Sequence, residues 1–213
     1  MSFFYQLIEA TDTNRLDLEA LPSVQDMLNG RFSKEKYIDF LHKIYPIVLH
    51  FCPIMAAASS RCTNEMKEVR DYFYEQINEE KGHEDMVLDD LASFDVQPAQ
   101  VIAATPAFPV QAMIGYNYYM LDRVHPCGVL GMVYVLEIIS SVYGGHVAAS
   151  ISQSLDRPLN AGFSFLDSHS SMDMEHMAKL RKLLQSIDSP AVQNVLIESV
   201  KMNFYMVMQI FKE

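Results

Sequence analysis

One long uncharged segment constrains the fold more than any other feature of the sequence. Across residues 128–151 the only acidic or basic side chains are Glu137 and His146. This length would suffice to cross a bilayer. However, the segment holds several glycines and serines and lacks a basic flank, and a carboxylate in the middle of a lipid-facing helix costs several kcal/mol. We therefore expect a helix buried on all sides within a bundle, outside any membrane, and we find no second segment of this kind.

The remaining chain also predicts helices, because its apolar residues recur every three or four positions and almost never alternate. Ser33 and Ser189 are expected helix N-caps, the latter followed by Pro190 at the first helical position. No repeat or linker interrupts the pattern, which predicts an all-α fold and a single helical domain over residues 1–213. The expected helices cover about 3–10, 23–28, 33–60, 64–94, 110–124, 128–151, 164–187 and 190–211.

Composition excludes some classes of function. Lys and Arg number 16 and Asp and Glu number 27, giving a net charge of −11, and no basic run could bind successive phosphates. A nucleic-acid partner is therefore not expected. The three cysteines form no Cys-x-x-Cys pair, which is typical of a reducing compartment, and the acidic amino terminus lacks the features of a secretory signal. We interpret the protein as cytoplasmic.

Candidate metal ligands lie on three of the expected helices. A Glu and a His three residues apart are expected on one helix face, a lone Glu lies in the apolar helix, and a His-x-x-x-Asp-x-x-His triplet places its side chains within about 60° of one another. The residues are Glu80 and His83, then Glu137, then His169, Asp173 and His176.

Three imidazoles and three carboxylates suit a pair of first-row metal ions. Iron or manganese is favoured over zinc, because the set offers no thiolate and many carboxylate oxygens. Each group also has an ordinary interpretation: the acidic surroundings of Glu80 are typical of a solvated face, Glu137 could be a neutral buried acid, and the triplet could be a polar helix face. Tyr134, one turn before Glu137, is either a hydrogen-bond donor or electron relay at the site or a core tyrosine.

The order of these six residues resembles the haem-oxygenase-like di-iron oxidases and oxygenases, also called iron-containing redox enzymes. The resemblance implies the seven-helix haem oxygenase or TenA-type bundle. It also implies two iron ions that reduce dioxygen to a peroxo species, which then oxidises a small carboxylate or amine with an apolar tail. We expect catalytic roles for Glu137 and, from its position one turn away, Tyr134. Related bundles are often dimers, so a homodimer is a further expectation.

The sequence departs from one branch of that family, the chlamydial (CADD-like) type. That type has a carboxylate where this chain has Gln76, and a tyrosine where it has Leu136. Glu80 resembles instead the carboxylate of the alkene-forming decarboxylases, with Glu79 and Glu84 as rival ligands.

The sequence is also compatible with other functions of the same fold and with a binding role. Haem oxygenases hold haem through a histidine in the first helix, and this chain has none before His42. A metal-free TenA-like thiaminase would need a cysteine nucleophile, for which Cys127 is the candidate, and a PqqC-like oxidase would line its cavity with His, Tyr and Arg. A non-catalytic effector that binds another protein through an acidic surface would have no use for the histidine triplet.

Overall fold

A computed structural model describes residues 2–212, except for the side chains of 169–174. All regular secondary structure in this range is helical, which confirms the predicted fold class. Interruptions divide some of the expected helices, such as 64–94 and 128–151, into shorter pieces. The α-helices are α1 (Phe3–Glu19), α2 (Pro22–Leu28), α3 (Lys34–Ser59), α4 (Lys67–Glu80), α5 (His83–Ala92), α6 (Pro98–Ala103), α7 (Phe108–Tyr119), α8 (Val129–Ile139), α9 (Gly145–Ser154), α10 (Ser164–Gln185) and α11 (Pro190–Lys212).

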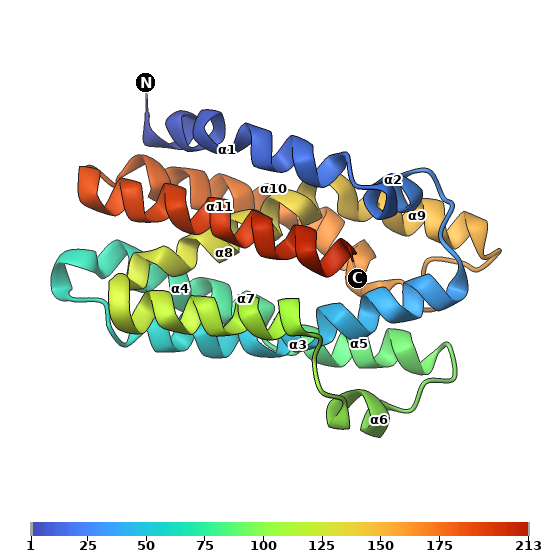
Figure 1. Cartoon of the computed structure of the whole chain (residues 1–213). Helices are drawn as coiled ribbons and strands as arrows, with labels where there is room; N and C mark the ends of the chain where they lie inside the picture. The colour runs from blue at the N-terminus through green and yellow to red at the C-terminus, as the bar shows by residue number, and fades with distance from the viewer. Residues whose placement is uncertain (1, 213) are drawn as a thin grey trace.

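The helices lie roughly along one direction, with α1, α10 and α11 on one side and α3, α4 and α7 on the other (Figure 1). Helix α8 crosses between these groups and packs against α11, where Gly131 directly faces Ser199. A Cβ atom at Gly131 would lie 2.4 Å from the Ser199 hydroxyl oxygen, so this close approach requires glycine. The arrangement places Glu137 of α8 in the middle of the bundle.

Local signals explain several helix ends. The predicted N-cap Ser33 is confirmed, since its hydroxyl accepts a hydrogen bond from the Lys36 amide at 3.3 Å. The first helix is longer than the predicted 3–10 and continues to Glu19. Arg15 pairs with Asp12 and Glu19 at helical spacing, and Leu18 is buried, so the outer charges and the inner apolar contact both favour this extension.

The predicted continuous helix over 64–94 is wrong. A short 3₁₀ turn precedes α4, and the chain leaves the helix after Glu80 and starts α5 at His83. Gly82 adopts a φ of +93°, a left-handed conformation that glycine accommodates without steric cost. Glu80 and His83 therefore flank a turn between two helices instead of sharing one helix face.

The predicted apolar helix over 128–151 is also interrupted. A 3₁₀ turn precedes α8, and a π-helical segment, Ser140–Gly144, joins α8 to α9 three residues after Glu137. The π segment packs against α10. Single π turns of this kind are frequent at functional sites because they displace side chains from regular helical positions.

Two stretches, Lys34–Ser59 and Pro126–Ser154, are apolar and long enough to pass a test for membrane-spanning helices, so the expectation of no second segment like 128–151 is wrong. The apolar window of the second is 61% buried within the fold, and core helices of soluble proteins pass the same test.

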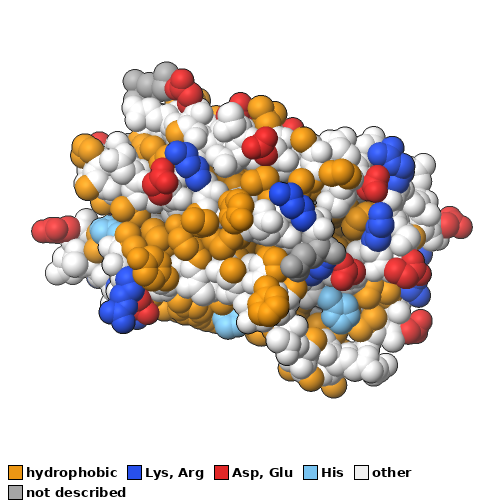
Figure 2. Space-filling view, viewed as in Figure 1, with side chains coloured by type: hydrophobic (Ala, Val, Ile, Leu, Met, Phe, Trp, Pro, Cys, Tyr) orange, Lys and Arg blue, Asp and Glu red, His pale blue; other side chains and the backbone are white. Residues whose placement is uncertain are grey.

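Hydrophobic side chains also gather on one outer face, over α7 and α11 (Figure 2). The large exposed ones on these helices are Phe108, Tyr119, Met202 and Tyr205.

Candidate metal centre

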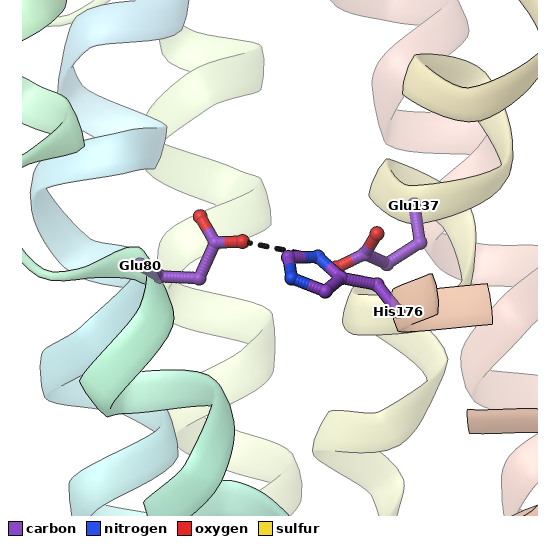
Figure 3. A group of neighbouring side chains, drawn as sticks. All are labelled: Glu80, Glu137 and His176. Carbon is purple, nitrogen blue, oxygen red and sulfur yellow. Dashed lines mark ion pairs between the residues drawn. The ribbon is translucent and has the colours of Figure 1, made fainter. Parts of the chain in front are cut away.

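A buried group of two carboxylates and one imidazole lies at the centre of the bundle. Glu80 comes from the end of α4, Glu137 from α8 and His176 from α10, and the three side chains converge (Figure 3). One ligand atom from each lies within 4.8 Å of the other two. His176 Nδ1 is 3.3 Å from Glu137 Oε1 and 3.5 Å from Glu80 Oε1. This spacing would allow all three to bind one cation.

His83 joins this group through Glu80. Its Nδ1 is 2.8 Å from Glu80 Oε2, and both side chains are buried. Glu80 thus presents one carboxylate oxygen to each of two histidines, His83 and His176. A carboxylate in this position can serve two neighbouring metal ions.

Electrostatics favour a positive charge at this point. The hydrogen bond and charge of Glu137, with the charges of Glu80 and Glu79, raise the pKa of His176 to about 9 against the opposing effect of burial. In the metal-free protein the imidazolium proton therefore balances part of the carboxylate charge at neutral pH. A metal cation would replace this proton.

Two of the six predicted ligands, His169 and Asp173, lie outside the described side chains. The backbone of α10 runs through both positions, so the helix that carries His176 also carries them. Of the predicted set, the structure brings together Glu80, His83, Glu137 and His176.

The rival acids have other partners. Glu79 Oε2 lies 3.2 Å from Nε2 of His176, on the opposite side of the ring from Glu80, and Glu79 Oε1 lies 2.8 Å from the Lys179 ammonium. Glu84 accepts a hydrogen bond from the Gly82 amide at 3.1 Å and so stabilises the turn.

Tyr134 faces away from the expected position. Its hydroxyl is hydrogen-bonded to Thr11 of α1, and burial raises the pKa of Tyr134 to about 12 despite the opposing effects of Thr11 and the nearby Arg15. The structure therefore places this phenol in contact with the first helix.

Two polar residues lie on the same helix as Glu80: Tyr72, which sequence reasoning missed, and Gln76, which it named only as a departure from the chlamydial type. Gln76 and Tyr72 are buried on α4, one and two turns before Glu80. Burial, followed by the charges of Glu137 and Glu80, raises the pKa of Tyr72 well above its usual value. Neither the Tyr72 hydroxyl nor Gln76 Oε1 has a hydrogen-bond partner among the described residues. The four-residue spacing of Tyr72, Gln76 and Glu80 is the signal that could have revealed this shared helix face.

An apolar cavity of about 150 Å³ adjoins the carboxylates. Glu80 and Glu137 line it beside mostly aliphatic and aromatic side chains. Tyr143, another lining residue, donates its hydroxyl proton to Glu19. Its other walls include Ile44, Phe51, Leu136, Val147, Leu166 and Phe211. The cavity therefore has a strongly apolar body and a carboxylate-bearing end, next to His176.

The cysteines lack the features of activated nucleophiles. Burial raises the pKa of Cys127 to about 12 and that of Cys52 to about 11, the latter with a further contribution from the charge of Glu80. Reactive thiols need a lowered pKa and access to solvent. Cys127 is only 2% exposed.

Comparison with known proteins gives a family match and several structural neighbours. The profile of a family described as iron-containing redox enzymes matches residues 38–203. No curated protein matches the chain in sequence.

Three solved structures show the same fold at low sequence identity. A Shewanella denitrificans domain of unknown function with a heme oxygenase-like fold is 19% identical, with a TM-score of 0.87 over 100% of this chain and 91% of its own. A TenA homologue from Pseudomonas syringae pv. tomato is 15% identical, with a TM-score of 0.83 over 98% and 90%. The heme oxygenase of Leptospira interrogans is 18% identical, with a TM-score of 0.77 over 99% and 98%. The fold is therefore heme oxygenase-like, as predicted.

Proposed function

The chain belongs to the family of iron-containing redox enzymes, and from this premise we propose that it is a non-haem di-iron oxidase or oxygenase that uses dioxygen. Its ligands would be Glu80, His83, Glu137, His169, Asp173 and His176. The observation that carries the proposal is the buried group of Glu80, Glu137 and His176, whose ligand atoms lie within 4.8 Å of one another.

The donor chemistry fits iron. Carboxylate oxygens and imidazole nitrogens suit iron or manganese, and no thiolate is among the six residues. Two buried carboxylates beside one imidazole leave negative charge, which a bound cation would neutralise. The first helix contains no histidine that could hold haem. When bound, the two metal ions would supply electrons to dioxygen.

The chain itself would bind and orient the substrate. The apolar walls of the cavity exclude water and hold an apolar tail, while Glu80 and Glu137 mark the end where the reacting group must lie. We propose a small carboxylate or amine with an apolar tail, because its polar end could bind the metal ions while its tail fills the cavity. Gln76 would support the site from the side of α4 through the hydrogen bond that its Nε2 donates to Glu79 Oε2 at 3.4 Å.

The test is metal content after anaerobic loading with Fe(II), followed by optical spectra on admitting oxygen. We expect about two iron ions per chain in the native protein and a clear loss in His176→Ala. His146→Ala is the matched control, because His146 is exposed and its Nε2 lies 2.8 Å from the Leu28 carbonyl oxygen. Equal iron in the native protein and His176→Ala would contradict the proposal.

The metal-free alternatives receive less support. A thiaminase of the TenA type needs a thiolate, and burial keeps both Cys52 and Cys127 protonated at neutral pH. Undiminished turnover in the presence of a strong chelator would favour such a hydrolase or a PqqC-like oxidase. An effector that only binds a partner protein would keep its function in His176→Ala.

A further inference from the structure

Glu79 and Glu80 are neighbours in sequence but approach opposite nitrogens of the same imidazole. Glu80 Oε1 lies 3.5 Å from Nδ1 of His176, while Glu79 Oε2 lies 3.2 Å from Nε2. Glu137 Oε1 is also on the Nδ1 side, at 3.3 Å. The two nitrogens of the ring thus have different surroundings: Nδ1 faces the candidate ligands Glu80 and Glu137, and Nε2 faces Glu79.

Glu79 is held in place from the helix that carries His176. Lys179 lies three residues after His176 on α10, and its ammonium is 2.8 Å from Glu79 Oε1. Lys179 also pairs with Glu75 at 2.9 Å and Glu175 at 3.2 Å, which raise its pKa together with Glu79 and keep it charged. Each carboxylate oxygen of Glu79 therefore has its own partner on α10.

We propose that Glu79 is a positioning residue for the metal centre. It accepts the hydrogen bond from Nε2–H of His176, which fixes the ring orientation and leaves the Nδ1 lone pair directed toward Glu80 and Glu137. Carboxylates that orient a metal-binding histidine in this way fix its tautomer and increase its basicity. Lys179 holds Glu79 in the required rotamer. The inference rests on the proposed function and assigns Glu79 a role other than metal ligand.

The experiment compares Glu79→Ala with Glu75→Ala. Both substitutions remove a carboxylate from Lys179, but only Glu79 contacts His176, so Glu75→Ala controls for the ion pair. Fe(II) affinity is measured anaerobically by competition with a chelator of known affinity. We expect a dissociation constant about 10–100-fold higher in Glu79→Ala, and close to the native value in Glu75→Ala. Glu79→Gln keeps one acceptor oxygen and is expected between the two.

A second readout follows the imidazole directly. The native protein and the variants are loaded with Zn(II) as a diamagnetic probe, and the ¹⁵N shifts of His176 report which nitrogen carries the proton. We expect a proton fixed on Nε2 in the native protein and Glu75→Ala, and an Nε2–H that exchanges faster with solvent in Glu79→Ala. Circular dichroism shows whether each variant is folded, and Glu79→Gln provides the result if Glu79→Ala is not.

The outcomes separate the two proposals. If the native protein binds no iron, the metal centre fails and the positioning role fails with it. If the native protein binds iron, but Glu79→Ala and Glu75→Ala have the same affinity and the same His176 spectrum, only the role of Glu79 is wrong.

Discussion

Helices α4 and α8 each supply one carboxylate to the candidate metal centre, but they surround it differently. Helix α4 buries Tyr72, Gln76 and Glu80 together and adds Glu79 at its edge. Helix α8 is otherwise strongly apolar, and Glu137 is its only charged side chain. Glu80 therefore has polar neighbours on its own helix and Glu137 has none, while both carboxylates share the partner His176 of α10.

The two helices also end differently. Helix α4 stops at Glu80 and the chain turns at Gly82, whereas α8 passes into a π-helical segment that lines the cavity. The turn after α4 depends on the local backbone conformation of Gly82, whereas the π segment after α8 packs against α10, which is distant in sequence. The comparison suggests that the α4 side fixes the ligands and the α8 side shapes the space for substrate.

The largest expected effect is on the pKa of His176, which depends on Glu137. Glu137→Gln should lower the pKa of His176 from about 9 by roughly one to two units, because it removes the charge that most favours the imidazolium. An NMR titration of the metal-free protein measures this. Glu175→Gln is the control, since Glu175 is exposed and pairs with Lys179. If the pKa of His176 is unchanged in Glu137→Gln, the charge of Glu137 on α8 is not what keeps His176 on α10 protonated.

The same shift predicts a pH dependence of stability. Because the pKa of folded His176 lies above the ordinary 6.5, its contribution to the free energy of unfolding is fully present below about pH 6.5 and is lost as pH rises through about 9. Urea unfolding of the metal-free protein should therefore show a steeper loss of stability across this window in the native chain than in Glu137→Gln. Parallel curves would contradict the linkage.

The turn after α4 should resist substitution for conformational reasons alone. Gly82→Ala is expected to lower the free energy of unfolding by about 1–2 kcal/mol, because alanine is strained at a φ of +93°. An added Cβ meets no atom within 4 Å, so no clash contributes. Urea unfolding measures the change, and Gly82→Asn, which tolerates positive φ better, should lose less. Equal losses in both variants would indicate another cause.

In the π segment after α8, replacing a glycine by alanine should stabilise the protein, in contrast to Gly82→Ala. A Cβ at Gly144 would lie 3.6 Å from the Ser140 hydroxyl oxygen and 3.7 Å from the Leu166 carbonyl oxygen, which is ordinary contact. Gly144→Ala is therefore expected to raise the free energy of unfolding by about 0.5–1 kcal/mol, through reduced chain entropy. Gly144 lines the cavity, so calorimetric binding of octanoate to the iron-loaded protein should weaken. If Gly144→Ala is more stable but binds octanoate as the native protein does, the π segment does not contact the bound octanoate.

The smallest effect is expected at Tyr72. Tyr72→Phe should leave the free energy of unfolding within about 0.5 kcal/mol of the native value, because its hydroxyl makes no hydrogen bond to the described residues. Tyr37→Phe is the control: its buried hydroxyl donates to the Gly162 carbonyl at 3.0 Å, and its loss should cost about 1 kcal/mol. Equal losses by urea unfolding would mean that Tyr72 has a partner of comparable strength.

Most of the helical pattern could be predicted from local sequence. Apolar spacing, the Ser33 cap and Pro190 located the helices, and these signals act over a few residues. The interruptions were missed for two physical reasons. At Gly82 the polar periodicity continues through the turn, and at 140–144 the apolar run is uniform, so a widened helical turn leaves no trace in hydropathy.

The site divides in the same way. The sequence by itself determined which residues could bind metal, because the identities and spacings of Glu80, His83, Glu137 and His176 follow from the chain. Only the tertiary structure decided which side of the His176 ring each acid faces: Glu80 and Glu137 meet Nδ1, and Glu79 meets Nε2. It also turned Tyr134 toward α1 and Tyr72 toward the carboxylates. The physical reason is that these choices depend on how separate helices are rotated against one another, and that rotation is set by the packing of the whole bundle.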